Sequence, residues 1–162
     1  MESEQEQSRL AARLSALLDS AMDGIITIDD SQRIILYNRA AERMFGWSAV
    51  QVLGRHLDML IPKRFRAAHR DHVGTFAATG VTSRRMGGAV LLGLRAGGEE
   101  FPIEASISQL ESPDGKLFTV ILRDVRERVR AQEELAAFAA EATGVREQEK
   151  ARIARELHDE LA

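Results

Sequence analysis

The sequence predicts an α+β domain, an antiparallel sheet with helices on one face, flanked by a helical extension at each end. Two short apolar segments come first, helical segments follow, and three alternating segments complete the domain. Turn-forming residues separate consecutive strand segments, which favours antiparallel hairpins. Because strands and helices are grouped rather than alternating along the chain, the pattern is typical of α+β architecture.

The N-terminal segment, residues 1–22, is expected to contain an amphipathic helix from residue 8 to residue 22. Its apolar residues, Leu10, Leu14, Leu17 or Leu18, and Ala21, recur at intervals of three or four. This stripe needs a partner, either the sheet or the same helix of a second copy. We favour a dimer, because the stripe lies outside the expected core.

The domain itself is expected to span residues 23–125. Strands are predicted at residues 24–29 and 33–37, and the turn Asp29–Gln32 joins them. Helical segments are then predicted at 39–45, 49–53, 57–61 and 63–78, the first capped by Asn38 and ended by Gly46.

Three further strands, at residues 85–94, 101–110 and 116–123, complete a five-stranded antiparallel sheet. Gly97-Gly98 and Ser112-Pro113-Asp114-Gly115 provide the two hairpin turns. Phe101, Ile103, Ala105 and Ile107 alternate with polar residues, so one face of that strand is expected to be buried.

Composition limits the functional classes. The 162 residues are 44% hydrophobic and 29% charged, with a formal net charge of −3. The negative charge argues against generic binding to nucleic acid or to an anionic membrane. The absence of cysteine excludes disulfides, thiolate metal sites and cysteine-adduct photochemistry. With an acidic start unlike a signal peptide, the chain is expected to be cytoplasmic.

Residues 20–126 resemble a PAS sensor domain. The resemblance rests on three stretches: Asp23-Gly24-Ile25-Ile26-Thr27-Ile28-Asp29, Ile35-Leu36-Tyr37-Asn38-Arg39-Ala40-Ala41-Glu42-Arg43-Met44-Phe45-Gly46-Trp47, and Gly97-Gly98-Glu99-Glu100-Phe101-Pro102-Ile103-Glu104. Arg123-Asp124-Val125 is similar to the family's exit motif, although Arg126 replaces its usual Thr. The resemblance implies a PAS fold.

On the long predicted helix, Phe65, His69, Val73 and Phe76 share one face, which we expect to point at the sheet. The segment Ile61-Pro62-Lys63-Arg64-Phe65-Arg66-Ala67-Ala68-His69 resembles that of haem-binding PAS oxygen sensors. This resemblance implies that His69 is the proximal iron ligand of haem b.

Met86 is a second candidate ligand for that iron. The distal Arg of the oxygen sensors is replaced here by Ala89, which favours another gas or a redox signal. The alternatives are a core histidine bonded to a carbonyl group, or a pocket that holds a small metabolite or is closed.

Residues 126–148 are expected to form a signalling coiled coil. Leu135, Phe138, Ala142 and Val145 recur at three, four and three, the spacing of a parallel dimer seam. Ile153 follows Val145 after eight residues rather than seven, which shifts the phase near Gly144. Two alternatives remain: a solvated helix, or two helices broken at residues 143–144.

Residues 149–162 are expected to begin the dimerisation and phosphoacceptor helix. The motif Glu-Lys-x-Arg-Ile-Ala-Arg-Glu-Leu-His-Asp-Glu-Leu-Ala resembles the phosphoacceptor box of sensor histidine kinases, specifically the nitrate/nitrite-sensor subfamily. The resemblance implies that His158 is the phosphorylated residue and Asp159 the acid that assists transfer.

These features together favour the sensory PAS region of a cytosolic two-component sensor histidine kinase. Its expected partners are a second copy, the ATP-binding kinase domain and a response-regulator receiver domain. The residues contain no nucleotide-binding loop, so we expect this stretch, as a piece of a longer kinase, to be inactive alone. The alternatives are a haem-based gas sensor centred on His69, and a ligand-free PAS dimerisation module.

Overall fold

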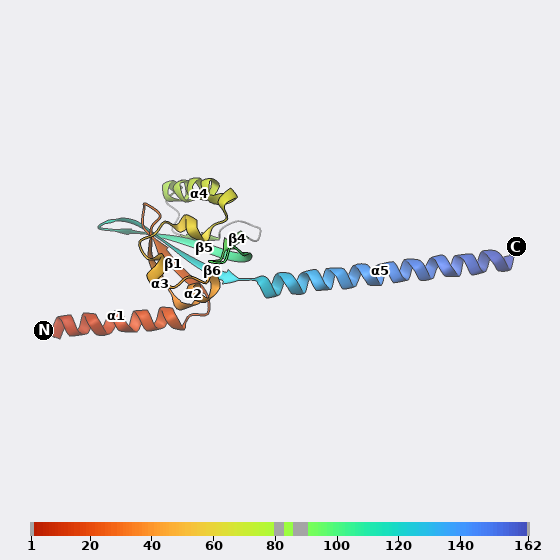
Figure 1. Ribbon diagram of the computed structural model, residues 1–162, viewed down its shortest axis with the longest axis horizontal. Coiled ribbons are helices and arrows are strands. Elements are labelled where there is room, and N and C mark those ends of the chain that lie inside the picture. Colours follow the sequence, from red (N-terminus) through yellow and green to blue (C-terminus); the bar gives the residue numbers. More distant parts are fainter. Residues whose placement is uncertain (1, 80–82, 86–90, 162) are drawn as a thin grey trace. The chain divides into compact units, whose positions relative to one another are not determined.

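The computed structural model describes residues 2–79, 83–85 and 91–161 (Figure 1). The chain divides into two units, residues 1–125 and residues 126–162. The first unit contains the sheet and most of the helices, and the second is one long helix. No helix in the described ranges combines the length and the apolar character needed to cross a bilayer.

One antiparallel sheet forms the centre of the first unit. Its strands are β1 (Gly24–Ile28), β2 (Ile34–Tyr37), β3 (Ser83–Arg85), β4 (Leu91–Leu94), β5 (Glu100–Ser112) and β6 (Gly115–Asp124). The order is β2-β1-β6-β5-β3, and β4 also pairs with β5. The strand predicted at residues 85–94 therefore corresponds to β3 and β4, and the residues between them lie outside the described ranges.

The register of β5 explains which face of the sheet is covered. Phe101, Ile103, Ala105 and Ile107 are buried, while the residues between them are exposed or half-buried. Ile107 pairs with Val120 of β6, which is also buried. This alternation confirms the predicted two-faced sheet.

Short helices cover the buried face. They are α2 (Arg39–Phe45), α3 (Ala49–Val52), the 3₁₀ turns η1 (Leu57–Leu60) and η2 (Lys63–Phe65), and α4 (Arg66–Thr79). Phe45 of α2 packs edge-on against Phe101, with ring centroids 5.2 Å apart. The ring centroids of Phe76 in α4 and Phe118 in β6 are 6.4 Å apart. The predicted α+β architecture, an antiparallel sheet with helices on one face, is confirmed.

Asn38 connects three elements through its side chain. Its Oδ1 accepts hydrogen bonds from the backbone N–H groups of Ile25 and Ala41, at 2.8 and 3.0 Å. Its Nδ2 donates to the carbonyl groups of Leu18 and Asp23, at 2.9 and 3.1 Å. Asn38 is therefore the predicted cap of α2, and its side chain also connects α2 by hydrogen bonds to β1 and to the end of the first helix.

The first helix, α1 (Glu2–Ser20), is longer than predicted at its N-terminus and two residues shorter at its C-terminus. Glu2 and Glu4 in its first turn favour the earlier start, because carboxylates stabilise the positive end of a helix dipole. None of the described residues of α1 is buried, and Leu10, Leu14 and Leu17 are exposed. Its apolar stripe has no partner within the described part of one chain.

The second unit is α5 (Arg126–Leu161), a continuous helix of 36 residues. It runs through Gly144 without interruption, so the alternative of two helices broken at residues 143–144 is wrong. Thr143 stays in the helical pattern and its Oγ1 donates to the Ala139 carbonyl at 2.9 Å.

Candidate functional site

An apolar cavity of about 330 Å³ lies inside the first unit. Its walls come from the buried face of the sheet, from η1 and from the start of α4. The lining residues are aliphatic and aromatic apart from two histidines, His69 and His72. Such a cavity suits a small molecule with a mainly apolar surface.

His69 projects from α4 into this cavity, as the sequence predicted. Its side chain is half-buried, and its Nδ1 is buried without a hydrogen-bond partner. Burial lowers the pKa of His69, and the nearby Asp58 carboxylate opposes that shift. The imidazole is therefore neutral near pH 7, the form that binds metals.

Val73 and Phe76 are buried on the predicted face of α4, and Phe65 in the turn before that helix is less covered. Phe65 lines the cavity yet is 42% exposed. It is the last residue of the 3₁₀ turn η2, so the predicted face continues into that turn but is less covered there.

An ion pair stands beside Phe65. The Arg64 guanidinium lies 4.5 Å from the centre of the Phe65 ring and forms two hydrogen bonds with the Glu100 carboxylate, one of them 2.7 Å long. Glu100 begins β5, so this pair links the two walls of the cavity. The hydrogen bonds raise the pKa of Arg64 and lower the pKa of Glu100. Sequence reasoning missed this contact, because it joins residues 36 positions apart.

Met86 and Ala89 both lie outside the described residues, so Met86 stays a prediction. Arg84 and Arg85 belong to β3, of which the structure describes the backbone. The described residues hold no group of three or more His, Asp or Glu side chains able to bind a metal ion together. A metal ion bound by side chains of the described cavity walls would need His69 or His72 as a ligand.

The lining residues fit the requirements of haem. A neutral imidazole with an unpaired buried nitrogen enters an otherwise apolar cavity, which is the environment of a proximal haem ligand. In this arrangement His69 would hold the iron, and the aliphatic walls would surround the porphyrin.

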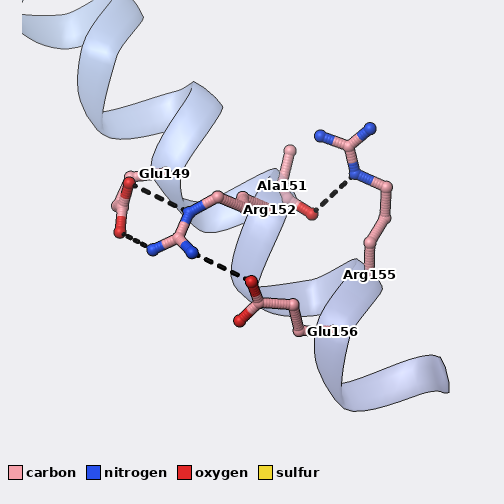
Figure 2. Close-up of polar contacts among 5 residues, drawn as sticks. All are labelled: Glu149, Ala151, Arg152, Arg155 and Glu156. Carbon is pink, nitrogen blue, oxygen red and sulfur yellow. Dashed lines mark hydrogen bonds and ion pairs between the residues drawn. The ribbon is translucent and has the colours of Figure 1, made fainter. Parts of the chain in front are cut away.

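The second candidate site lies near the end of α5. His158 and Asp159 are exposed, and within the described chain no hydrogen bond or ion pair engages either side chain. Six residues before His158, Arg152 forms ion pairs with Glu149 and Glu156 (Figure 2). The bond to Glu156 is 2.9 Å long. These pairs stabilise the helix locally and leave the imidazole accessible.

The family of the chain is established by comparison. A profile described as the PAS fold matches residues 18–130, which is more than half of the chain. The chain belongs to the PAS family.

Two curated relatives connect this domain with sensor histidine kinases. Sensor protein FixL of Bradyrhizobium diazoefficiens is 30% identical over 128 residues, which cover 79% of this chain and 25% of FixL. The cell-division control histidine kinase PdhS of Brucella ovis is 30% identical over 146 residues, which cover 90% of this chain and 14% of PdhS. The chain thus spans a quarter or less of these relatives.

Among solved structures, the PAS domain of an HTR-like protein from Haloarcula marismortui is similar in fold. The TM-score is 0.62 at 23% identity, and the match covers 76% of this chain and 98% of that domain. The fold and the relatives agree that this is a PAS sensory domain homologous to those of sensor histidine kinases.

Proposed function

We propose that the chain is the sensory region of a two-component histidine kinase and that α5 transmits its signal to His158. One observation supports this most directly: α5 begins at Arg126, immediately after the sheet ends, and continues unbroken to the motif around His158. A continuous helix is able to carry a rotation or shift from the sensor to a distant residue.

Dimerisation through α5 is part of this proposal. Leu135, Phe138 and Val145 are all at least 60% exposed and follow heptad spacing. A second copy aligned in parallel would bury this seam, and the stripe of α1 offers a further contact. The dimer is cytoplasmic in this proposal.

Phosphotransfer would then proceed through His158. A ring nitrogen attacks the γ-phosphorus of ATP held by the kinase domain, the bond to the β-γ bridging oxygen breaks and ADP leaves. Asp159 orients the imidazole and accepts its proton. The phosphoryl group passes next to an aspartate of a response-regulator receiver domain, which restores the free histidine.

Labelled ATP and a catalytic domain supplied in trans test this proposal. Wild-type protein is expected to become labelled, and His158→Gln to remain unlabelled. Asp159→Asn should slow labelling by roughly 10²–10⁴-fold if its carboxylate acts as general base. Glu160→Gln, the neighbouring exposed acid, is the matched control and should label normally. Equal labelling of His158→Gln and wild type would remove His158 from this role.

A second candidate, a haem-based gas or redox sensor, is favoured by the imidazole of His69, which lines an otherwise mainly apolar cavity. Haem would supply an iron centre that binds a gas or changes oxidation state. His69 would hold that iron, and the cavity walls would exclude water. Met86 remains the second candidate ligand for that iron.

A visible absorption spectrum of protein produced with haem precursor tests the cofactor. A strong Soret band is expected in the wild type and should be lost in His69→Ala. His158→Ala, which changes a histidine of the other unit, should keep the band. A colourless wild type would eliminate haem and favour a metabolite sensor or a ligand-free dimerisation module.

A further inference from the structure

Two buried polar atoms near the cavity have no hydrogen-bond partner, and their chemical characters are complementary. They are Nδ1 of His69 and Oδ1 of Asp58. A carboxylate oxygen only accepts hydrogen bonds, whereas Nδ1 of a neutral imidazole donates when it carries the ring proton. Buried polar atoms are rarely left unpaired in native proteins, so the two atoms call for a common explanation.

The fold brings Asp58 against the turn of α4 that carries His69. Asp58 is the second residue of η1, and its Oδ2 lies 3.7 Å from Nε of Arg70, the residue after His69. Nδ1 of His56 accepts a hydrogen bond from the backbone N–H of Asp58 at 3.1 Å, so this nitrogen carries no proton for the carboxylate. Oδ1 therefore keeps its full capacity as an acceptor.

No direct hydrogen bond joins Asp58 to His69, although the Asp58 carboxylate raises the pKa of this imidazole. A buried donor and a buried acceptor that each lack a direct partner can both be satisfied by one ordered water that bridges them. We propose that Asp58 is a positioning residue that acts through such a water on Nδ1 of His69. This contact fixes the tautomer with the proton on Nδ1 and leaves Nε2 with a free lone pair.

The tautomer determines what His69 can offer to a ligand. An unprotonated Nε2 accepts a hydrogen bond or coordinates a metal ion, but it cannot donate. This inference rests on the proposed function of the cavity as the sensor's ligand site. It adds that a ligand in contact with His69 presents either a hydrogen-bond donor or a metal ion, in addition to an apolar body. A ligand whose polar group is solely an acceptor is disfavoured.

Long-range proton–nitrogen NMR of protein labelled with ¹⁵N-histidine reports the tautomer directly. The chain has four histidines, so single His→Gln variants assign each signal. His69 of the wild type is expected to be mainly protonated at Nδ1. In Asp58→Ala the population should shift toward the Nε2-protonated form, which free imidazole side chains prefer in water.

Asp71→Ala is the matched control, since it removes an exposed carboxylate from the same helix. It should leave the tautomer of His69 unchanged. Asp58→Asn retains the volume of the side chain and is the variant to use if alanine unfolds this wall. It should also reduce the Nδ1-protonated share. A wild-type His69 protonated at Nε2, or a tautomer insensitive to both substitutions at Asp58, would overturn the inference.

Haem titration provides a second measurement. Loss of a residue that orients a metal-binding histidine lowers metal affinity by roughly 10- to 100-fold, so Asp58→Ala should weaken haem binding by that factor and Asp71→Ala should not. The tautomer is measured without haem. A protein that binds no haem therefore refutes the haem candidate alone, whereas an unchanged tautomer refutes the role of Asp58 alone.

Discussion

Apolar side chains of the same type are buried in the first unit of the chain and exposed in the second. Phe101 in β5 is fully buried, whereas Phe138 in α5 is 70% exposed. Ile28 in β1 is likewise buried, and Ile153 in α5 is 44% exposed. The sheet and its helices bury their own apolar surface, but a single helix has no second layer on which to pack. The first unit is therefore expected to fold on its own contacts, and the second to depend on a partner.

The largest expected effect comes from replacing a large buried side chain in the apolar core of the first unit by a small one. Phe101→Ala should lower the free energy of unfolding by about 3–5 kcal/mol, because it leaves a cavity beside Phe45. Urea unfolding followed by fluorescence of Trp47, the single tryptophan, measures this. Phe138→Ala is the matched control and should leave the unfolding of this unit unchanged. Equal destabilisation by both substitutions would contradict the division into two units.

The converse experiment concerns the proposed dimer. Phe138→Ala removes one buried ring from each copy, and burial of a Phe side chain contributes roughly 1.5–3 kcal/mol. The dimer should therefore weaken by roughly 100-fold or more, as measured by sedimentation equilibrium. Arg130→Ala, on an exposed position of the same helix, should change dimerisation little. A wild-type chain that stays monomeric at high concentration would refute the proposed dimer contact along α5.

A smaller effect is expected at Gly144, where the apolar register shifts. A Cβ atom added there meets nothing within 4 Å, so Gly144→Ala should stabilise α5 by roughly 1 kcal/mol. We expect the stiffer joint to alter the ratio of kinase to phosphatase activity in a protein that includes the catalytic domain. Unchanged activities would show that the joint does not take part in signalling.

The smallest effect concerns pH and distinguishes the buried His69 from a solvated one. Burial lowers the pKa of His69 in the folded protein, so the unfolded chain binds the proton more readily. Stability should consequently fall as the pH drops below about 6.5, until the folded-state pKa is reached. His69→Leu should lessen this fall in urea-unfolding series above and below that pH. Parallel pH profiles for the two proteins would contradict the burial.

Local features of the fold were predictable from the sequence, because neighbouring residues determine them. Asn38 and Gly46 bound α2 as expected, and Gly46 adopts a left-handed conformation with φ of 78°. The hairpin glycines Gly98 and Gly115 also have positive φ. Caps and tight turns depend on a few consecutive residues, so their residue types are sufficient to locate them.

The site was predictable only in part. Helical periodicity identified His69 as a core-facing histidine, because the period is a property of α4 alone. Phe65 lines the same cavity, as the spacing predicted, but its partial exposure is not visible in the residue pattern. Asp58 and Glu100 were missed because their roles depend on contacts with α4 and η2 across long sequence separations. The role of His158 rests on a motif resemblance and awaits experiment.

Asn38 has a consequence for how the domain can be shortened. All four of its side-chain hydrogen bonds are in use, two as donor and two as acceptor. Asp could replace the acceptors but not the donors, so only an amide satisfies this junction. A fragment beginning at Asp23 would deprive the amide of the Leu18 carbonyl. Tension applied along α1 would likewise reach α2 through two contacts, the Asn38 amide and the Asp19 carboxylate, which accepts a hydrogen bond from the Arg39 N–H at 3.2 Å.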